Sequence, residues 1–130
     1  MEFFIKQNSN LPILKMDVVM DGRTDSSKNF YSVLDNATIR FSMKSENDGI
    51  QKIFMRPAYI TEKERNNPDS QREYYIYYKW RGKDTSKKGR FIGEFLIELQ
   101  NGELIGPIRE NLYINIIWFY WVSHLYLRRR

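Results

Sequence analysis

The stretch Ala37-Thr38-Ile39-Arg40-Phe41-Ser42-Met43-Lys44 decides the fold class of this 130-residue chain. Its apolar residues alternate with polar ones, which is the period-two pattern of a strand with one buried face. The chain then passes through Ser45 to Gly49, where Asp-Gly favours a hairpin turn, into a second expected strand at Ile50 to Tyr59. Pro57 is expected to mark an edge position or the end of that strand.

Other segments repeat this β signature along the chain. Residues 91–99 alternate again, Asn101-Gly102 favours a turn, and residues 73–80 are β-prone on both faces, as expected for a central strand. Further short strands are predicted at residues 3–5, 13–20, 104–105 and 112–116, with a break at Gly106-Pro107. Residues 62–71 are interpreted as an exposed loop and residues 30–34 as a short helical turn. About seven or eight short strands predict an all-β chain folded as an antiparallel β-sandwich.

Composition fits one β-rich domain and narrows the chemistry. The 42% hydrophobic and 28% charged residues are near the globular average, and the 15% aromatic content favours pleated surfaces and binding interfaces. The absence of cysteine excludes a disulfide scaffold, a thiolate metal site and a Cys nucleophile.

Few residues remain as candidates for a metal or catalytic site. His124 has no second ligand at metal-binding spacing, so we interpret it as part of the C-terminal tail. Asp17, Asp21 and Asp25 lack the dense oxygen-ligand pattern of a calcium loop, so we interpret these three residues as turn chemistry around Gly22. We therefore expect no catalytic residue, no metal and no cofactor, and we predict that the protein is not an enzyme.

The charge balance is mildly basic. The formal net charge is +5, and three of the positive charges are Arg128, Arg129 and Arg130. The first residues lack the basic and apolar regions of a secretory signal, so we expect the protein to stay where it is made.

Five motifs in a fixed order resemble the immunoglobulin-like N-terminal domain of tailed-phage baseplate upper proteins and related phage tail modules. They are Leu34 to Phe41, Tyr78-Lys79-Trp80 leading into Asp84-Thr85, Gly89 to Phe95, the turn at Gly102, and Leu112 to Ile116. The resemblance covers roughly residues 11–116 and implies an immunoglobulin-like β-sandwich over residues 1–116, followed by an apolar, arginine-terminated extension over residues 117–130. The sequence departs from the family in the insertion-like residues 66–71 and at its C-terminal end.

The same resemblance implies a role in assembly. Members of the family are non-enzymatic virion structural proteins, so it implies a tail, baseplate or collar subunit of a tailed bacteriophage, made in the host cytoplasm and located in the virion. The implied partners are other virion structural proteins and further copies of this chain. Nucleic acid is not expected as a partner, and a membrane is a less favoured partner than another protein.

Two aromatic features form the predicted subunit interface. In residues 73–80, half of the aromatic side chains are expected to fill the core and the other half to face a partner. Residues 112–127 carry no charge, and this run of about 16 residues falls short of the about 20 that span a membrane. We favour an arm laid on a neighbouring subunit, with a membrane anchor as the alternative because Trp and Tyr beside arginine resemble an interface pattern. The predicted interface residues are Tyr75, Tyr77, Trp118, Phe119, Tyr120, Trp121, Leu125, Leu127, Arg128 and Arg129.

A basic loop supports an alternative function. Its five cations are Arg81, Lys83, Lys87, Lys88 and Arg90. Such a loop suits contact with a polyanion, although a solvated hairpin loop is the favoured interpretation. Asp84-Thr85 within it fits a turn in which the Asp side chain bonds backbone N–H groups two residues on. The alternative to the virion subunit is therefore a small membrane-anchored or polyanion-binding β-domain protein.

Overall fold

The computed structural model describes residues 1–18, 36–64, 66–67, 73–99, 102–107 and 110–118. The described residues contain eight strands and no helix. The strands are β1 (Glu2–Lys6), β2 (Leu14–Val18), β3 (Thr38–Ser45), β4 (Gln51–Glu62), β5 (Tyr74–Tyr78), β6 (Gly89–Leu99), β7 (Gly102–Gly106) and β8 (Leu112–Ile117).

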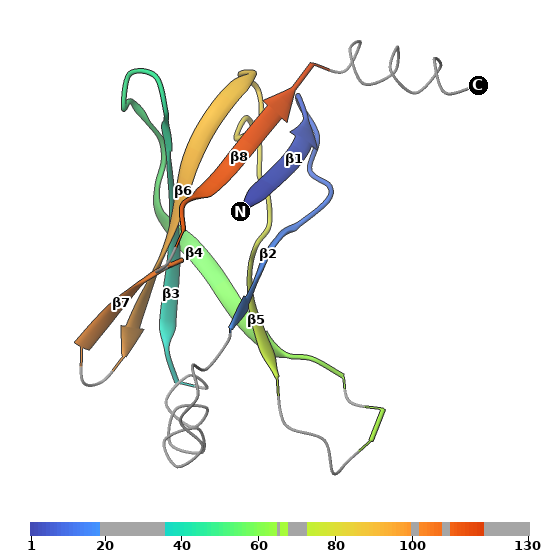
Figure 1. Cartoon of the computed structure of the whole chain (residues 1–130), viewed down its shortest axis with the longest axis vertical. Helices are drawn as coiled ribbons and strands as arrows, with labels where there is room; N and C mark the ends of the chain where they lie inside the picture. Colours follow the sequence, from blue (N-terminus) through green and yellow to red (C-terminus); the bar gives the residue numbers. More distant parts are fainter. Residues whose placement is uncertain (19–35, 65, 68–72, 100–101, 108–109, 119–130) are drawn as a thin grey trace.

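The strands form one nearly closed sheet in the order β1-β8-β6-β3-β4-β5-β2 (Figure 1). β7 lies off this path and pairs with residues 95–99 of β6, whereas β8 pairs with residues 89–93. All pairs are antiparallel except β1 with β8, which is parallel. The prediction of an all-β, largely antiparallel chain with about eight strands is confirmed, and the parallel pair is an addition that alternation alone did not predict.

The alternating residues build the core as the sequence predicts. Ile39, Phe41 and Met43 of β3 are buried, and every second residue of β6 and β8 is buried with them. Phe41 lies at the centre: its ring centroid is 4.7 Å from that of Tyr78 and 5.0 Å from that of Phe95. Apolar area removed from water in this way is the main stabilising contribution to the fold.

Gly93 of β6 makes the close approach of two neighbouring side chains possible. A Cβ at this position would lie 2.7 Å from Ile114 Cδ1 and 3.0 Å from Phe41 Cε1. Because real Cβ atoms do not approach carbon atoms so closely, the two buried side chains occupy the space that glycine leaves.

Several predicted boundaries differ from the structure, and β4 ends at Glu62 rather than near Tyr59. Pro57 lies inside β4 rather than at its end, and its β5 side is an edge position, as the alternative prediction has it, because pairing of β4 with β5 begins only at Tyr59. Gly102 is the first residue of β7, paired with Leu99, rather than a turn residue. β8 includes Ile117, whose carbonyl accepts the Gln7 amide at 2.8 Å, so the strand extends one residue beyond the predicted limit.

Several predictions fall on residues that the structure does not describe. They are the helical turn at residues 30–34, the turn at Asp21-Gly22, much of the loop at 62–71, and the extension from Phe119 to Arg130. Of that loop, Glu62 ends β4, and Lys63, Glu64, Asn66 and Asn67 lie outside strands.

Candidate interaction surfaces

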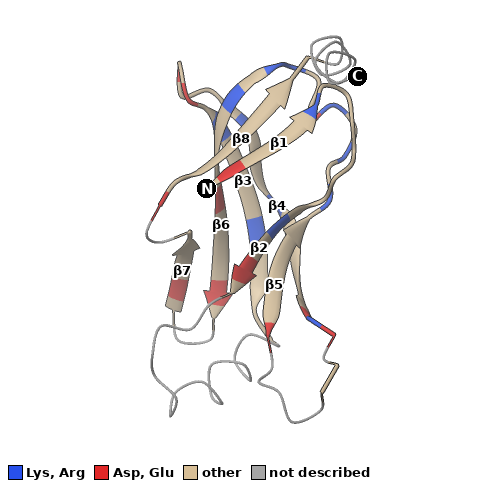
Figure 2. Cartoon of the chain, turned by 45° about the vertical axis from the view of Figure 1, so that its right-hand side comes forward, with Lys and Arg blue, Asp and Glu red and all other residues tan. Residues whose placement is uncertain are grey.

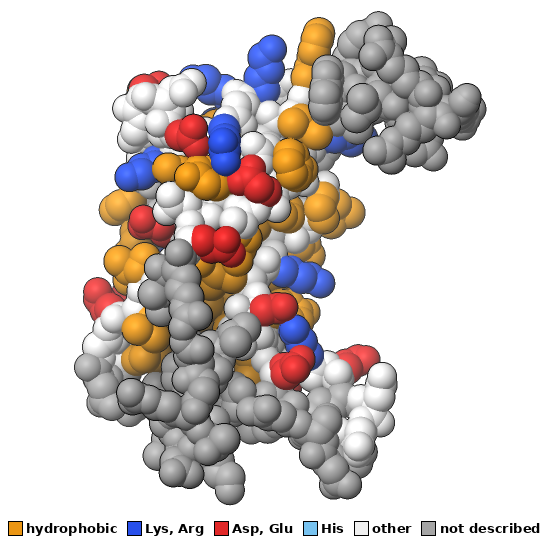
Figure 3. Space-filling model, viewed as in Figure 1, with side chains coloured by type: hydrophobic (Ala, Val, Ile, Leu, Met, Phe, Trp, Pro, Cys, Tyr) orange, Lys and Arg blue, Asp and Glu red, His pale blue; other side chains and the backbone are white. Residues whose placement is uncertain are grey.

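An apolar groove lies on the outer face of the sheet, over β3, β4, β6 and β7. It is a hollow of about 220 Å³, and we call it the outer groove. Its apolar walls are Phe54, Met55, Ile92, Leu96 and Ile105, and its polar walls are Ser42, Lys44, Gln51 and Glu94. Phe54 is 72% exposed and Ile105 is 56% exposed. Figure 3 shows hydrophobic side chains at the molecular surface beside acidic ones. An exposed apolar patch rimmed by polar residues is typical of a docking surface.

A β-bulge in β4 produces one wall of this groove. Met55 has a φ of 53°, and the register of β3 and β4 shifts between Phe41 and Met43. The displaced Met55 amide donates to Ser42 Oγ at 2.9 Å, which satisfies a group that the bulge removes from the ladder. The bulge keeps Met55 beside the exposed Phe54 in the outer groove, while Ala58 returns to the core side.

A tyrosine patch occupies the outer face of β4 and β5. The Tyr77 ring packs at a tilt against Tyr59, with ring centroids 5.6 Å apart, and against Tyr75, with centroids 5.9 Å apart. Lys15 Nζ lies 5.0 Å from the centre of the Tyr75 ring, which is cation–π distance.

The sequence predicted how this strand divides its aromatic side chains. Tyr74 and Tyr78 are buried, whereas Tyr75 and Tyr77 are half-buried on the outer face, so the expected division between core and outer face is confirmed. Sequence reasoning missed Tyr59, because it belongs to another strand and joins the patch only through the pairing of Tyr59 with Tyr77.

The predicted basic residues do not form one group. The β5–β6 loop carries four exposed cations, Arg81, Lys83, Lys87 and Lys88. Lys88 Nζ lies 5.2 Å from the ring centre of Trp118, which is itself 53% exposed. Phe119 to Arg129 of the predicted interface lie outside the described residues.

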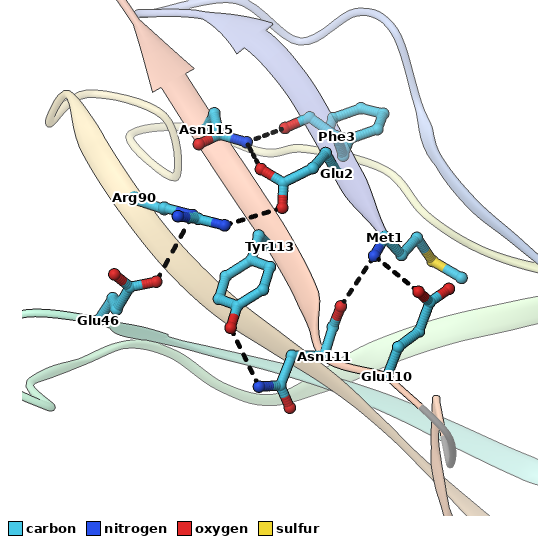
Figure 4. Close-up of polar contacts among 9 residues, drawn as sticks. All are labelled: Met1, Glu2, Phe3, Glu46, Arg90, Glu110, Asn111, Tyr113 and Asn115. Carbon is cyan, nitrogen blue, oxygen red and sulfur yellow. Dashed lines mark hydrogen bonds and ion pairs between the residues drawn. The ribbon is translucent and has the colours of Figure 1, made fainter.

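Arg90 is held in a separate cluster of contacts. It pairs with Glu2 at 2.9 Å and with Glu46 at 3.5 Å, and its guanidinium carbon lies 3.8 Å from the Tyr113 ring centre. Figure 4 shows that these contacts tie β6 to β1 and β8. A hydrogen bond from Asn115, together with Arg90, lowers the pKa of Glu2. These contacts explain why the short parallel strand β1 stays attached to β8.

A second hollow, of about 360 Å³, lies beside the β5–β6 loop. Arg81 and Lys83 line it, and so do Lys52 and Arg56 from β4. The two β4 residues were not predicted, since they are distant in sequence and lack a local basic pattern. Arg56 pairs with Asp84, so one of the four positive charges is already neutralised.

Asp84 is the centre of a buried polar network. It is 3% exposed, and its Oδ2 accepts hydrogen bonds from the Tyr78 hydroxyl at 2.6 Å and the Arg81 amide at 2.8 Å. Its Oδ1 accepts a hydrogen bond from Arg56 Nη1. The predicted bond to an amide two residues further on is wrong: the Ser86 amide donates to the Lys83 carbonyl, and the Asp84 carboxylate instead accepts from the Arg81 amide.

This network also changes the acidity of its members. Burial, and the bond donated to Asp84, raise the pKa of Tyr78 to about 12. The hydrogen bond to Tyr78 and the charge of Asp84 raise the pKa of Arg56. Tyr78 therefore stays neutral and serves as a hydrogen-bond donor under ordinary conditions.

The same loop is tied to the connection between β1 and β2. Thr85 Oγ1 donates to the Ser9 carbonyl at 2.8 Å, and the Trp80 indole donates to the Pro12 carbonyl at 3.0 Å. The residues that carried the family resemblance in this region, Tyr78 to Thr85, thus hold the loops in place.

The described side chains have an uneven charge distribution along the molecule (Figure 2). One end, which we call the basic end, carries the β5–β6 loop with Arg81, Lys83, Lys87 and Lys88. The opposite end, the acidic end, carries the carboxylates of Asp17, Glu62, Glu73, Glu98 and Glu103. At that end Lys63 pairs with Asp17 at 2.9 Å and Arg40 with Glu98 at 3.7 Å.

Metal-binding clusters and membrane-spanning helices are both absent from the described residues. Within those ranges, no group of three His, Cys, Asp or Glu side chains is placed to hold a metal ion, and His124, Asp21 and Asp25 lie outside them. No helix in the described part of the chain is long and apolar enough to cross a membrane.

Comparison with family models, with curated proteins and with solved structures found no match for this chain. Its function is therefore inferred from the surfaces described above.

Proposed function

We propose that this protein is a non-enzymatic structural subunit that works by binding neighbouring protein chains. The observation that carries the proposal is the outer groove, where Phe54 and Ile105 are 72% and 56% exposed although the core beneath them is complete. Burying one such side chain contributes about 1.5–3 kcal/mol, so a partner that covers several of them gains a stable contact.

The tyrosine patch supports the same function. Tyr59, Tyr75 and Tyr77 offer broad, rigid rings with polar tips, the residue type that interfaces favour. Both surfaces lie on the outer face of a sheet, where they need no rearrangement of the core to meet a partner.

The finer assignment follows the motif resemblance. We propose that the nearly closed sheet is an immunoglobulin-like sandwich in which β4 passes from one layer to the other, and that the protein is a tail, baseplate or collar subunit of a tailed-phage virion. Its partners are then other virion structural proteins and copies of itself. This assignment draws support from the order of the motifs between Leu34 and Ile116.

The test is the native mass of the full chain at high concentration, with and without mild detergent, measured by light scattering after gel filtration. A chain ending at Trp118, which retains all of β8, is the matched comparison. We expect a detergent-independent oligomer whose mass falls on truncation. A full chain that is a monodisperse monomer, or one that is soluble only in detergent, contradicts the proposal, and the second result favours a membrane anchor.

One observation favours polyanion binding as a second candidate. Lys52, Arg81 and Lys83 face a common hollow, and Arg56 joins them there. Binding of a polyanion such as heparin should then fall steeply with salt, because it depends on releasing counterions. Heparin binding that is undetectable at low salt eliminates this candidate.

A further inference from the structure

The outer groove is bordered by carboxylates at the acidic end of the molecule. Glu94 lies in the groove, and Glu98 and Glu103 are direct partners across β6 and β7. Like charges directly opposite one another destabilise a sheet, and Arg40 lies 3.7 Å from Glu98. The apolar pair Leu96 and Ile105 lies next to these two carboxylates. This surface therefore suits an apolar segment that also brings positive charge.

The chain itself contains a segment of that composition. Residues 119–127, Phe-Tyr-Trp-Val-Ser-His-Leu-Tyr-Leu, have no Asp, Glu, Lys or Arg, and Arg128, Arg129 and Arg130 follow. The apolar residues match the apolar walls of the outer groove, and the arginines match its carboxylates.

The direction of β8 separates this segment from the groove of its own chain. β8 runs antiparallel to β6, so that Ile116 pairs with Gly89 and the strand ends at the basic end. Glu98 lies nine residues further along β6, which at about 3.3 Å per residue is about 30 Å away. The last described residues of β8 point away from the carboxylates, toward any second molecule placed beyond the basic end (Figure 1).

We propose that copies of this chain associate head to tail, with residues 119–130 of one copy lying in the outer groove of the next. The proposal rests on the proposed function and names the partner of its main surface. In this contact a groove and a segment, two different surfaces, meet, so the interface is heterologous and joins the basic end of one copy to the acidic end of the next. The opposite charges of the two ends favour this orientation over a contact between like ends.

The first experiment is a charge exchange in the full chain, followed by sedimentation equilibrium. The groove variant carries Glu94→Arg and Glu103→Arg, and the segment variant carries Arg128→Glu, Arg129→Glu and Arg130→Glu. Each variant should weaken self-association by about tenfold or more, and combining both sets should restore it. Glu64→Arg, an exposed acidic residue outside the groove, is the matched control and should leave the mass unchanged.

A mixing experiment distinguishes a contact between groove and segment from a contact between two grooves or between two segments. Ile105→Asp blocks the groove but keeps the segment, whereas Trp121→Ser with Leu125→Ser blocks the segment but keeps the groove. Each variant alone should be a monomer of 15.8 kDa, and an equimolar mixture should give a complex of twice that mass and no larger one. Circular dichroism of each variant verifies that it is folded.

The outcomes separate the two proposals. If the wild-type chain self-associates but the variants, all folded, leave its mass unchanged, the groove contact is wrong and the proposed function stands. The groove contact is also wrong if each variant is a monomer and their mixture is monomeric as well. If the wild-type chain is a monomer at high concentration, both proposals are overturned.

Discussion

Replacing Asp84 with alanine should destabilise the fold by about 3 kcal/mol. The substitution removes three hydrogen bonds from a side chain that is 3% exposed. It leaves the buried Tyr78 hydroxyl and the part-buried Arg81 amide without their acceptor, and a fully buried group left unsatisfied costs about 1–3 kcal/mol. Arg56 adds less than a fully buried partner does, because its side chain is 37% exposed and water solvates part of its charge. The expected total of about 3 kcal/mol therefore lies at the low end of the about 3–5 kcal/mol that breaking a fully buried ion pair costs.

The assay is urea unfolding followed by far-UV circular dichroism, with the free energy of unfolding taken by linear extrapolation. Lys83→Ala, an exposed change in the same loop, is the control and should shift that free energy by less than about 0.5 kcal/mol. Asp84→Asn keeps an acceptor and should cost less than alanine. If Asp84→Ala loses less than about 1 kcal/mol, the network does not stabilise the fold and the reasoning about its buried partners is wrong.

Three further predictions concern titration, packing and exposure. Since the folded state raises the pKa of Tyr78 to about 12, stability should fall as pH rises from about 10 to about 12, and Tyr78→Phe should reduce this loss by about 1–2 kcal/mol in urea unfolding at each pH; identical pH profiles refute it. Gly93→Ala should cost about 1–3 kcal/mol, and adding Ile114→Val, which removes the clashing Cδ1, should recover part of it; additive free energies in a double-mutant cycle would mean no clash. Phe54→Ser should change the thermal midpoint little, because Phe54 is 72% exposed, whereas Phe95→Ala should cost about 3–5 kcal/mol; a large loss from Phe54→Ser contradicts its placement.

Alternation predicted the strands whose two faces meet different surroundings. β3, β6 and β8 each have one face in the core and one outside, so their buried residues recur with a period of two in both sequence and structure. The central position of β5 followed from the same physics, since apolar and aromatic residues on both faces suit a strand with two neighbours.

Long-range pairing could not be predicted in the same way. The parallel pair β1 and β8 joins the two ends of the described chain, and its contacts, such as Arg90 with Glu2, connect residues that share no local pattern. For the same reason, the sequence did not predict that Tyr59 belongs to the tyrosine patch, or that Lys52 and Arg56 line the hollow beside the β5–β6 loop. Each joins its group through sheet register, which depends on the whole fold.

The bulge at Met55 shapes both the apolar outer groove and the polar network around Asp84. Strict alternation from the buried Ile53 would place Arg56 on the outer face and Met55 inside. The extra residue reverses this order: it keeps Met55 with Phe54 in the outer groove and turns Arg56 inward to Asp84 and Tyr78. Ser42 Oγ stabilises the arrangement by accepting a hydrogen bond from the displaced Met55 amide. One local irregularity, invisible to any periodic pattern in the sequence, therefore both adds Met55 to the outer groove and brings Arg56 into the network around Asp84 that holds the β5–β6 loop.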